Sequence, residues 1–187
     1  MADTEERTSK LLMAWYLCFN PRAAAQQIKI GDERSFTDAL AFGAWCVVGS
    51  LGIAAAIAGK NAEGATTFLW QEVGIVGLAG NWLILYPFLR PFSWKALSFR
   101  SSAHVYCYYL MFGVLKLVAF YVGQYVQIVL LLVPLIDIWG LFVLAFLLKN
   151  VLHLQYWKFV SAFVIATLAI GVFLAVLAPS LLHQLTS

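Results

Sequence analysis

Charged residues are scarce in this sequence. Asp, Glu, Lys and Arg make up 11% of the 187 residues, whereas hydrophobic residues make up 63%. Soluble domains are about 25% charged and about 45–50% apolar. So few charges cannot cover a water-exposed surface around so apolar an interior, and the composition therefore indicates an integral membrane protein. The 16% aromatic content suits a helical bundle with many side chains at the membrane interfaces.

The sequence also lacks the spacings on which most catalytic, metal and nucleotide sites depend. Cys18, Cys46 and Cys107 form no C-x-x-C pair, and we interpret them as small apolar residues. Ser50 lies between glycines without the G-x-S-x-G spacing, and neither a glycine-rich phosphate loop nor a basic patch of nucleic-acid type occurs. We therefore expect no enzyme activity, no metal, no cofactor and no nucleic-acid partner.

The beginning of the chain carries more acidic than basic residues, unlike the start of a signal peptide. Asp3, Glu5 and Glu6 outnumber Arg7 and Lys10 ahead of the apolar run at 11–19. A secretory signal begins with a positively charged region, so we expect no cleaved segment here.

What the sequence has in abundance is long apolar runs. Five of them contain about 20 or more residues, which is enough for a helix to cross roughly 30 Å of hydrocarbon. Helices are expected because lipid offers no partner to an unpaired backbone group. The sequence therefore predicts an all-α fold, a polytopic membrane helical bundle, with a transmembrane domain at 39–187. The expected spans are about 39–59, 68–89, 103–125, 127–148 and 159–182.

Basic residues predict the orientation of these spans. Ten of the twelve Lys and Arg residues lie in 1–38, in the loop after the second span, or just before the fifth span. Lys60 is on the opposite side, and Lys116 is inside a span. The positive-inside rule then places the N-terminus in the cytoplasm and the C-terminus outside.

The segment 1–38 is predicted to be a cytoplasmic amphipathic leader. Leu11, Trp15 and Phe19 recur at helical spacing, which is typical of a helix lying in the membrane interface. Asn20 and Pro21, followed by Arg22, indicate the cap and first residue of a second short helix, which we expect to end at Gly31.

Small residues indicate where helices approach each other closely. They lie along one side of the first and second spans, and small residues allow close helix contact in lipid. The sequence does not decide between contact within the bundle and contact with a partner helix. These residues are Gly49 and Gly52 in the first span and Gly74, Gly77 and Gly80 in the second.

The candidate polar residues inside the expected spans are Glu72, Asn81, Lys116 and Asp137. A charge at the bilayer centre costs about 2.5–3.5 kcal/mol on insertion scales. In an antiparallel pair made of the third and fourth spans, Lys116 and Asp137 reach similar depths near the middle of the membrane. We therefore expect these two side chains to contact each other, either as a structural staple or as a site of ion or proton movement.

The layout resembles the Yip1 (YIPF-like) domain family, which includes bacterial inner-membrane members. The similarity rests on "CFNPRAAAQQI" at 18–28, "SWKALSFRSSAHVYCYYLM" at 93–111, and the region 135–164 that begins "LIDIWG". The leader is shorter than in eukaryotic members, and Lys116 lies in a third span that has no proline. The resemblance implies a five-span protein of a bacterial inner membrane, with its C-terminus in the periplasm.

Three functions remain open at this stage. The first is a membrane-organising or accessory interaction protein, whose partners are the lipid bilayer and other membrane proteins or a second copy of itself. The second is a small transporter, channel or channel subunit that uses Lys116 and Asp137. The third is a haem or redox subunit that uses His104 and His153, which lie on the same predicted side.

Overall fold

The computed structural model describes residues 9–58, 86–91 and 97–169. Within these ranges all regular secondary structure is helical, which confirms the all-α prediction. Residues 86–91 form a short helical segment. The other elements are α1 (Lys10–Phe19), α2 (Pro21–Gln27), α3 (Glu33–Ala58), α6 (Phe99–Gly123), the 3-10 helix η1 (Gln127–Leu131), α7 (Leu132–Leu152) and the helix Tyr156–Ala169.

Three of these segments are long and apolar enough to cross a membrane: Glu33–Ile57, Phe99–Gly123 and Gln127–Leu152. They correspond to the first, third and fourth predicted spans. Most of the second predicted span, and the end of the fifth beyond residue 169, lie outside the described residues. The chain is therefore a helical protein with three candidate membrane spans in the part that the structure describes.

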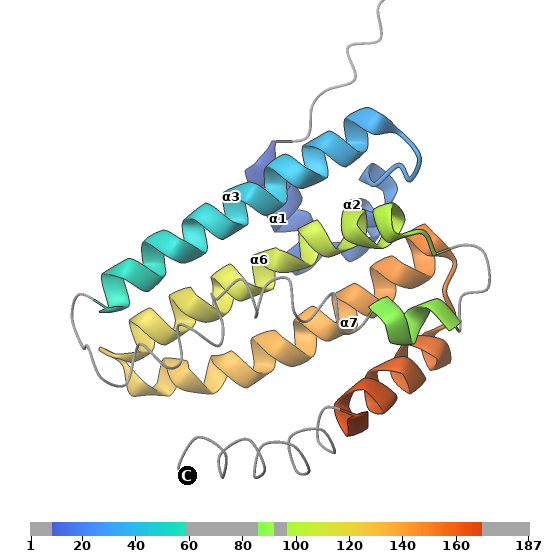
Figure 1. The fold of residues 1–187 in the computed structure, drawn as a ribbon. Helices are drawn as coiled ribbons and strands as arrows, with labels where there is room; N and C mark the ends of the chain where they lie inside the picture. Colours follow the sequence, from blue (N-terminus) through green and yellow to red (C-terminus); the bar gives the residue numbers. More distant parts are fainter. Residues whose placement is uncertain (1–8, 59–85, 92–96, 170–187) are drawn as a thin grey trace, which may run out of the picture.

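The three long helices lie side by side, with α1 and α2 against them (Figure 1). α3 and α6 run parallel, as two contacts show. Arg100 binds Glu33 near the start of both helices, and Ile57 and Leu117 share a small apolar cluster toward their other ends. The main core is larger and includes Phe42, Val105 and Val143. The larger part of the described core therefore lies toward the beginnings of α3 and α6.

Two glycines that sequence reasoning overlooked set the distances between helices. A Cβ atom at Gly43 would lie 3.2 Å from Cys107 Cβ, and one at Gly140 would lie 2.9 Å from Phe112 Cγ. The first glycine brings α3 close to α6, and the second brings α6 close to α7. Each glycine therefore leaves room for a side chain of the neighbouring helix.

The predicted packing role of Gly49 and Gly52 is not seen among the described residues. A Cβ atom at either position would have no neighbour within 4 Å. Both residues lie on a side of α3 that is open, whereas Gly43 occupies the side facing α6. A row of small residues indicates which face can approach another helix, and contact of this face with a partner helix stays a prediction. Gly74, Gly77 and Gly80 lie outside the described residues.

The N-terminal segment forms two short helices, as predicted. Asn20 caps α2 by accepting a hydrogen bond from the Ala23 N–H at 3.2 Å, and Pro21 is the first residue of that helix. α2 ends at Gln27 rather than at Gly31, because Ile28 takes an extended conformation and buries its side chain in the core. Gly31 instead supplies a left-handed backbone (φ +91°) in the turn before α3.

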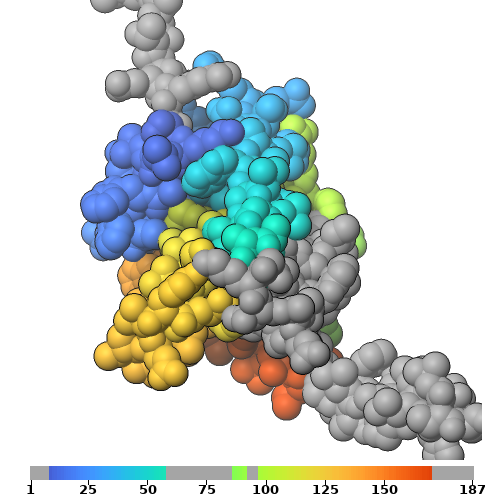
Figure 2. Space-filling view, turned by 90° about the vertical axis from the view of Figure 1, so that its left-hand side faces the viewer, coloured from blue at the N-terminus to red at the C-terminus, as the bar shows by residue number. Residues whose placement is uncertain are grey.

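The boundary expected at residue 38 lies inside a helix. α3 begins at Glu33, where the Asp32 carboxylate accepts a hydrogen bond from the Ser35 N–H at 2.9 Å. The leader and the first candidate span are therefore continuous through 33–38. In the space-filling view along the bundle, the N-terminal helices form one flank of the molecule (Figure 2).

The leader residues Leu11, Trp15 and Phe19 point away from the bundle and are 72%, 59% and 68% exposed. Met13 and Leu17, on the other side of α1, are buried in the core. The described bundle therefore does not cover this row of side chains. Arg22 is also exposed.

Candidate functional site

Lys116 and Asp137 form an ion pair between α6 and α7. Lys116 Nζ lies 2.9 Å from Asp137 Oδ1, which confirms the contact expected from their depths. Lys116 lies seven residues before the end of α6, and Asp137 lies in the second turn of α7. The pair therefore lies in the half of the hairpin toward the α6–α7 connection, five residues from the midpoint of each helix.

The geometry of the α6–α7 hairpin explains why these two side chains meet. The helices are antiparallel, and η1 connects them within a few residues. Gly123 lies against Leu130 at the turn, and Gly140 lies opposite Phe112. Lys116 and Asp137 fall between these two close contacts, so the spacing and register of the helices are set on both sides of the pair.

The two charges differ in exposure. The Lys116 side chain is 13% exposed, whereas that of Asp137 is 44% exposed. The Lys116 side chain is thus largely enclosed by the bundle, whereas the Asp137 side chain lies at the edge of the bundle. In hydrocarbon an ion pair is far less costly than either charge alone, so the contact explains how both residues can lie within candidate spans.

The other predicted intramembrane polar residues do not extend this site within the described chain. Glu72 and Asn81 lie outside the described residues. The described part contains no group of three or more His, Cys, Asp or Glu side chains that could hold a metal ion. At this site the described residues therefore form the Lys116–Asp137 ion pair, without a series of carboxylates along which a proton could move.

A second polar cluster lies where α3 and α6 begin, and sequence reasoning did not identify it. His104 is 2% exposed, and its Nε2 lies 3.3 Å from Ser35 Oγ. Ser35 Oγ already accepts the Lys29 N–H at 3.2 Å, so its hydroxyl proton can be donated to the imidazole. Ser35 and His104 are 69 residues apart, and no local spacing indicates that they meet.

This cluster is not a catalytic triad. The Asp32 carboxylate binds the backbone N–H of Ser35, so this contact caps α3 and does not orient the imidazole. Next to it, Arg100 binds Glu33 at 3.2 Å and lies 4.7 Å from the centre of the Phe36 ring. The cluster therefore joins the end of the leader to the first turns of two candidate spans.

The two histidines considered for a haem or redox site differ in their surroundings. His104 is buried between α3 and α6, and its Nε2 is engaged by Ser35. His153 is exposed and adopts a left-handed conformation (φ 55°) after the last residue of α7. Nothing in the described geometry assigns a shared ligand to the two.

The three cysteines are free thiols. Cys46 is buried in the core, and Cys107 contacts Gly43. Burial raises the pKa of the Cys18 thiol above its usual range, so this residue is less reactive than an exposed cysteine. These surroundings agree with the interpretation of all three as apolar packing residues.

The fold and the ion pair define an all-α protein with three candidate membrane spans. Comparison with protein-family models, with curated proteins and with solved structures finds no match to this chain. The similarity to the Yip1 family therefore has no independent support and is a proposal.

Proposed function

We propose that this chain is a non-enzymatic integral membrane protein that acts through contacts of its helix faces with other membrane components. The observation that carries the proposal is the open apolar face of α7. Leu135, Ile138 and Phe142 are all exposed and recur at spacings of three and four residues. In an antiparallel or parallel helix pair this spacing forms a continuous contact row.

The open small-residue side of α3 supports the same proposal. A Cβ atom added at Gly49 or Gly52 would meet no described atom within 4 Å, and Ala56 on the same side is exposed. Small residues let a second helix approach closely in lipid, where packing rather than hydrophobicity drives association. The protein therefore has two described helix faces on which a partner helix or a second copy fits.

The proposed topology has five spans, with the N-terminus in the cytoplasm and the C-terminus outside. The parallel arrangement of α3 and α6 supports it, because two parallel spans require the connecting chain to return across the membrane. Tyr86 stacks edge-on against Phe99 with ring centroids 5.5 Å apart, so the chain has returned to the starting end before α6 begins. A bacterial inner membrane and a Yip1-like role are part of the same proposal.

Photo-crosslinking tests the function directly. A benzophenone side chain placed at Ile138 or Phe142 should capture a protein partner in native membranes, because these positions face outward. The matched control is Val143, which is 0% exposed and should give only contacts within the chain. Capture of lipid alone from Ile138 and Phe142 would contradict a role in protein contacts.

A transporter, channel or channel subunit is the second candidate. The partial exposure of the Asp137 carboxylate favours this candidate, because an ion pair with a purely structural role does not need an accessible carboxylate. The two candidates differ in their response to Asp137→Asn: partner capture should survive the change, whereas transport through the pair should not. A haem or redox subunit, the third candidate, requires a visible absorption band in the purified protein.

A further inference from the structure

The turn after α7 brings two lysines and two aromatic rings together at one end of the bundle. α7 ends at Leu152, the chain reverses at His153, and the Leu154 N–H donates to the Leu148 carbonyl at 3.1 Å. The next helix, Tyr156–Ala169, begins immediately afterwards. This tight reversal returns Tyr156 to the side of α7 that carries Lys149.

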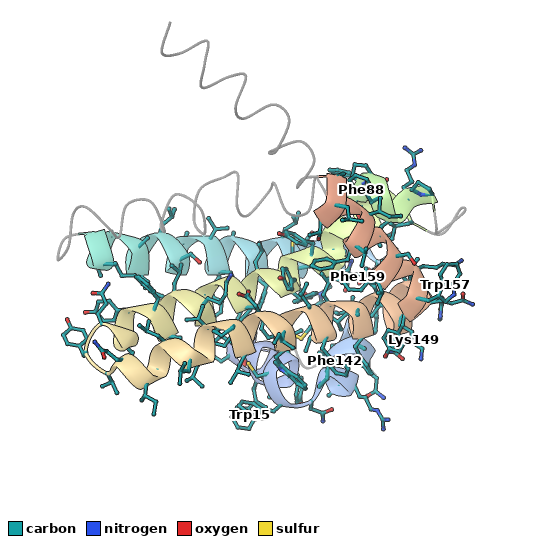
Figure 3. The ribbon with its side chains drawn as sticks, turned by 90° about the horizontal axis from the view of Figure 1, so that it is seen from below. Trp15, Phe88, Phe142, Lys149, Trp157 and Phe159 are labelled. Atoms are coloured by element: carbon teal, nitrogen blue, oxygen red, sulfur yellow. The ribbon has the colours of Figure 1, made fainter. Side chains whose placement is uncertain are left out.

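Each lysine lies near an aromatic ring. Lys149 Nζ is 4.3 Å from the centre of the Tyr156 ring, and Lys158 Nζ is 5.7 Å from that of Trp157. The Trp157 indole N–H donates to Gln155 Oε1 at 2.6 Å, which holds the ring at the turn. Figure 3 shows Lys149 and Trp157 beside each other at the same end of the bundle.

The positive charge of this turn has no acidic counterpart nearby in the sequence. Asp137 is the last acidic residue of the chain, and it binds Lys116 toward the opposite end of α7. Within the described residues neither Lys149 nor Lys158 has a carboxylate partner, in contrast to Arg100, which binds Glu33. Lys149 and Lys158 are therefore available for an anion from outside the chain.

We infer that this turn, defined as Lys149, Tyr156, Trp157 and Lys158, binds the headgroup of an anionic phospholipid. Basic side chains next to candidate membrane spans attract anionic lipids, at about 1 kcal/mol for each Lys or Arg near the surface. Tyr and Trp are the residues that favour the level of the headgroups. The lysine ammonium groups would bind the phosphodiester, and the two rings would lie among the glycerol and upper acyl carbons.

This inference rests on the proposed membrane location of the chain. Membrane fractionation of the wild-type protein tests that location separately: a protein recovered outside the membrane fraction would contradict the proposed function, whatever its lipid preference. A protein in the membrane fraction without selectivity for anionic lipid would contradict only the site.

Lipid binding to the purified full-length chain tests the site. Native mass spectrometry in mild detergent would compare phosphatidylglycerol with phosphatidylcholine of the same acyl chains. The wild type should retain phosphatidylglycerol preferentially. Lys149→Gln with Lys158→Gln should weaken that binding by about tenfold or more, since two contributions of about 1 kcal/mol are lost. Lys149→Arg with Lys158→Arg should restore it, because the charge is kept.

The matched control removes two charges elsewhere. Lys10→Gln with Arg22→Gln changes two exposed cations of the N-terminal segment and should leave the lipid preference unchanged. An equal loss in this control would mean that net charge alone governs binding and would overturn the site. So would equal retention of the two lipids by the wild type, or complete displacement of phosphatidylglycerol by inorganic phosphate at the same concentration.

Discussion

The enclosed ammonium of Lys116 and the half-open carboxylate of Asp137 meet at 2.9 Å between α6 and α7. Because the two side chains differ in exposure, removing one charge leaves the other in a different environment in each case. Loss of the carboxylate removes the Asp137 contact from an ammonium group that is only 13% exposed. Loss of the ammonium leaves the carboxylate on the more open side of the pair, where its side chain is 44% exposed.

The pair should therefore respond unequally to mutation. Asp137→Asn should lower the free energy of unfolding by roughly 1–3 kcal/mol, below the about 3–5 kcal/mol that follows the loss of one partner from a fully buried pair. Lys116→Met should cost less, and the double variant should be close to the wild type. Denaturation of the four proteins in one detergent measures the cycle. Strictly additive effects would show that the two charges are not coupled.

Gly140 provides a test of helix spacing. Gly140→Ala would place a methyl group 2.9 Å from Phe112 Cγ, so either the ring or the helix must shift. We expect a loss of about 1–3 kcal/mol, as for other overpacked contacts. Gly49→Ala and Gly52→Ala are the matched controls, because a Cβ there meets nothing within 4 Å. A stability for Gly140→Ala equal to that of the controls would mean that this close approach does not limit the packing.

The parts of the fold that depend on local pattern were predictable from the sequence. The three long described helices follow from apolar run length, and the start of α2 follows from Asn20 and Pro21. The contact of Lys116 with Asp137 was predictable because a short connection forces neighbouring spans to be antiparallel and depth then follows from residue number. Apolar run length, capping residues and residue number along a hairpin can all be read from the sequence without knowing any tertiary contact.

Features that depend on rotation about a helix axis were not predictable. The close glycines are Gly43 and Gly140, and not Gly49 and Gly52, because only the packed structure shows which side of a helix meets a neighbour. The contact of Ser35 with His104 joins residues in two helices that are distant in sequence. The end of α2 was misplaced because burial of Ile28 outweighs continuation of the helix.

Reporter fusions test the proposed topology. A fusion after Ser187 and one after Gly59 should report an outside location, and a fusion after Arg100 should report the cytoplasm, because ten of the twelve basic residues lie on the predicted inner side. The Arg100 fusion is the internal control, since its position follows from the parallel α3 and α6. A cytoplasmic location after Ser187 would contradict the five-span proposal.

The depth of α1 is the remaining prediction. The Trp139 indole N–H donates to the Cys18 carbonyl at 3.1 Å, so the end of α1 lies beside α7 at the level of Trp139. Trp139 is 13 residues from Leu152, or about 20 Å along the helix. Figure 3 likewise shows Trp15 near the middle of α7, away from Lys149 and Trp157. The exposed row of Leu11, Trp15 and Phe19 should therefore contact acyl chains rather than headgroups.

Spin labels measure this depth in a variant whose native cysteines are replaced. A label at Trp15 should match the oxygen accessibility of one at Phe142, an exposed position in the middle of α7, and exceed that of one at Lys149. Labels at Met13 and Leu17 should be shielded from both oxygen and a water-soluble relaxant, because these side chains are buried. A Trp15 label that behaves like the Lys149 label would place α1 at the headgroups, and the membrane boundary would then lie closer to the middle of α7.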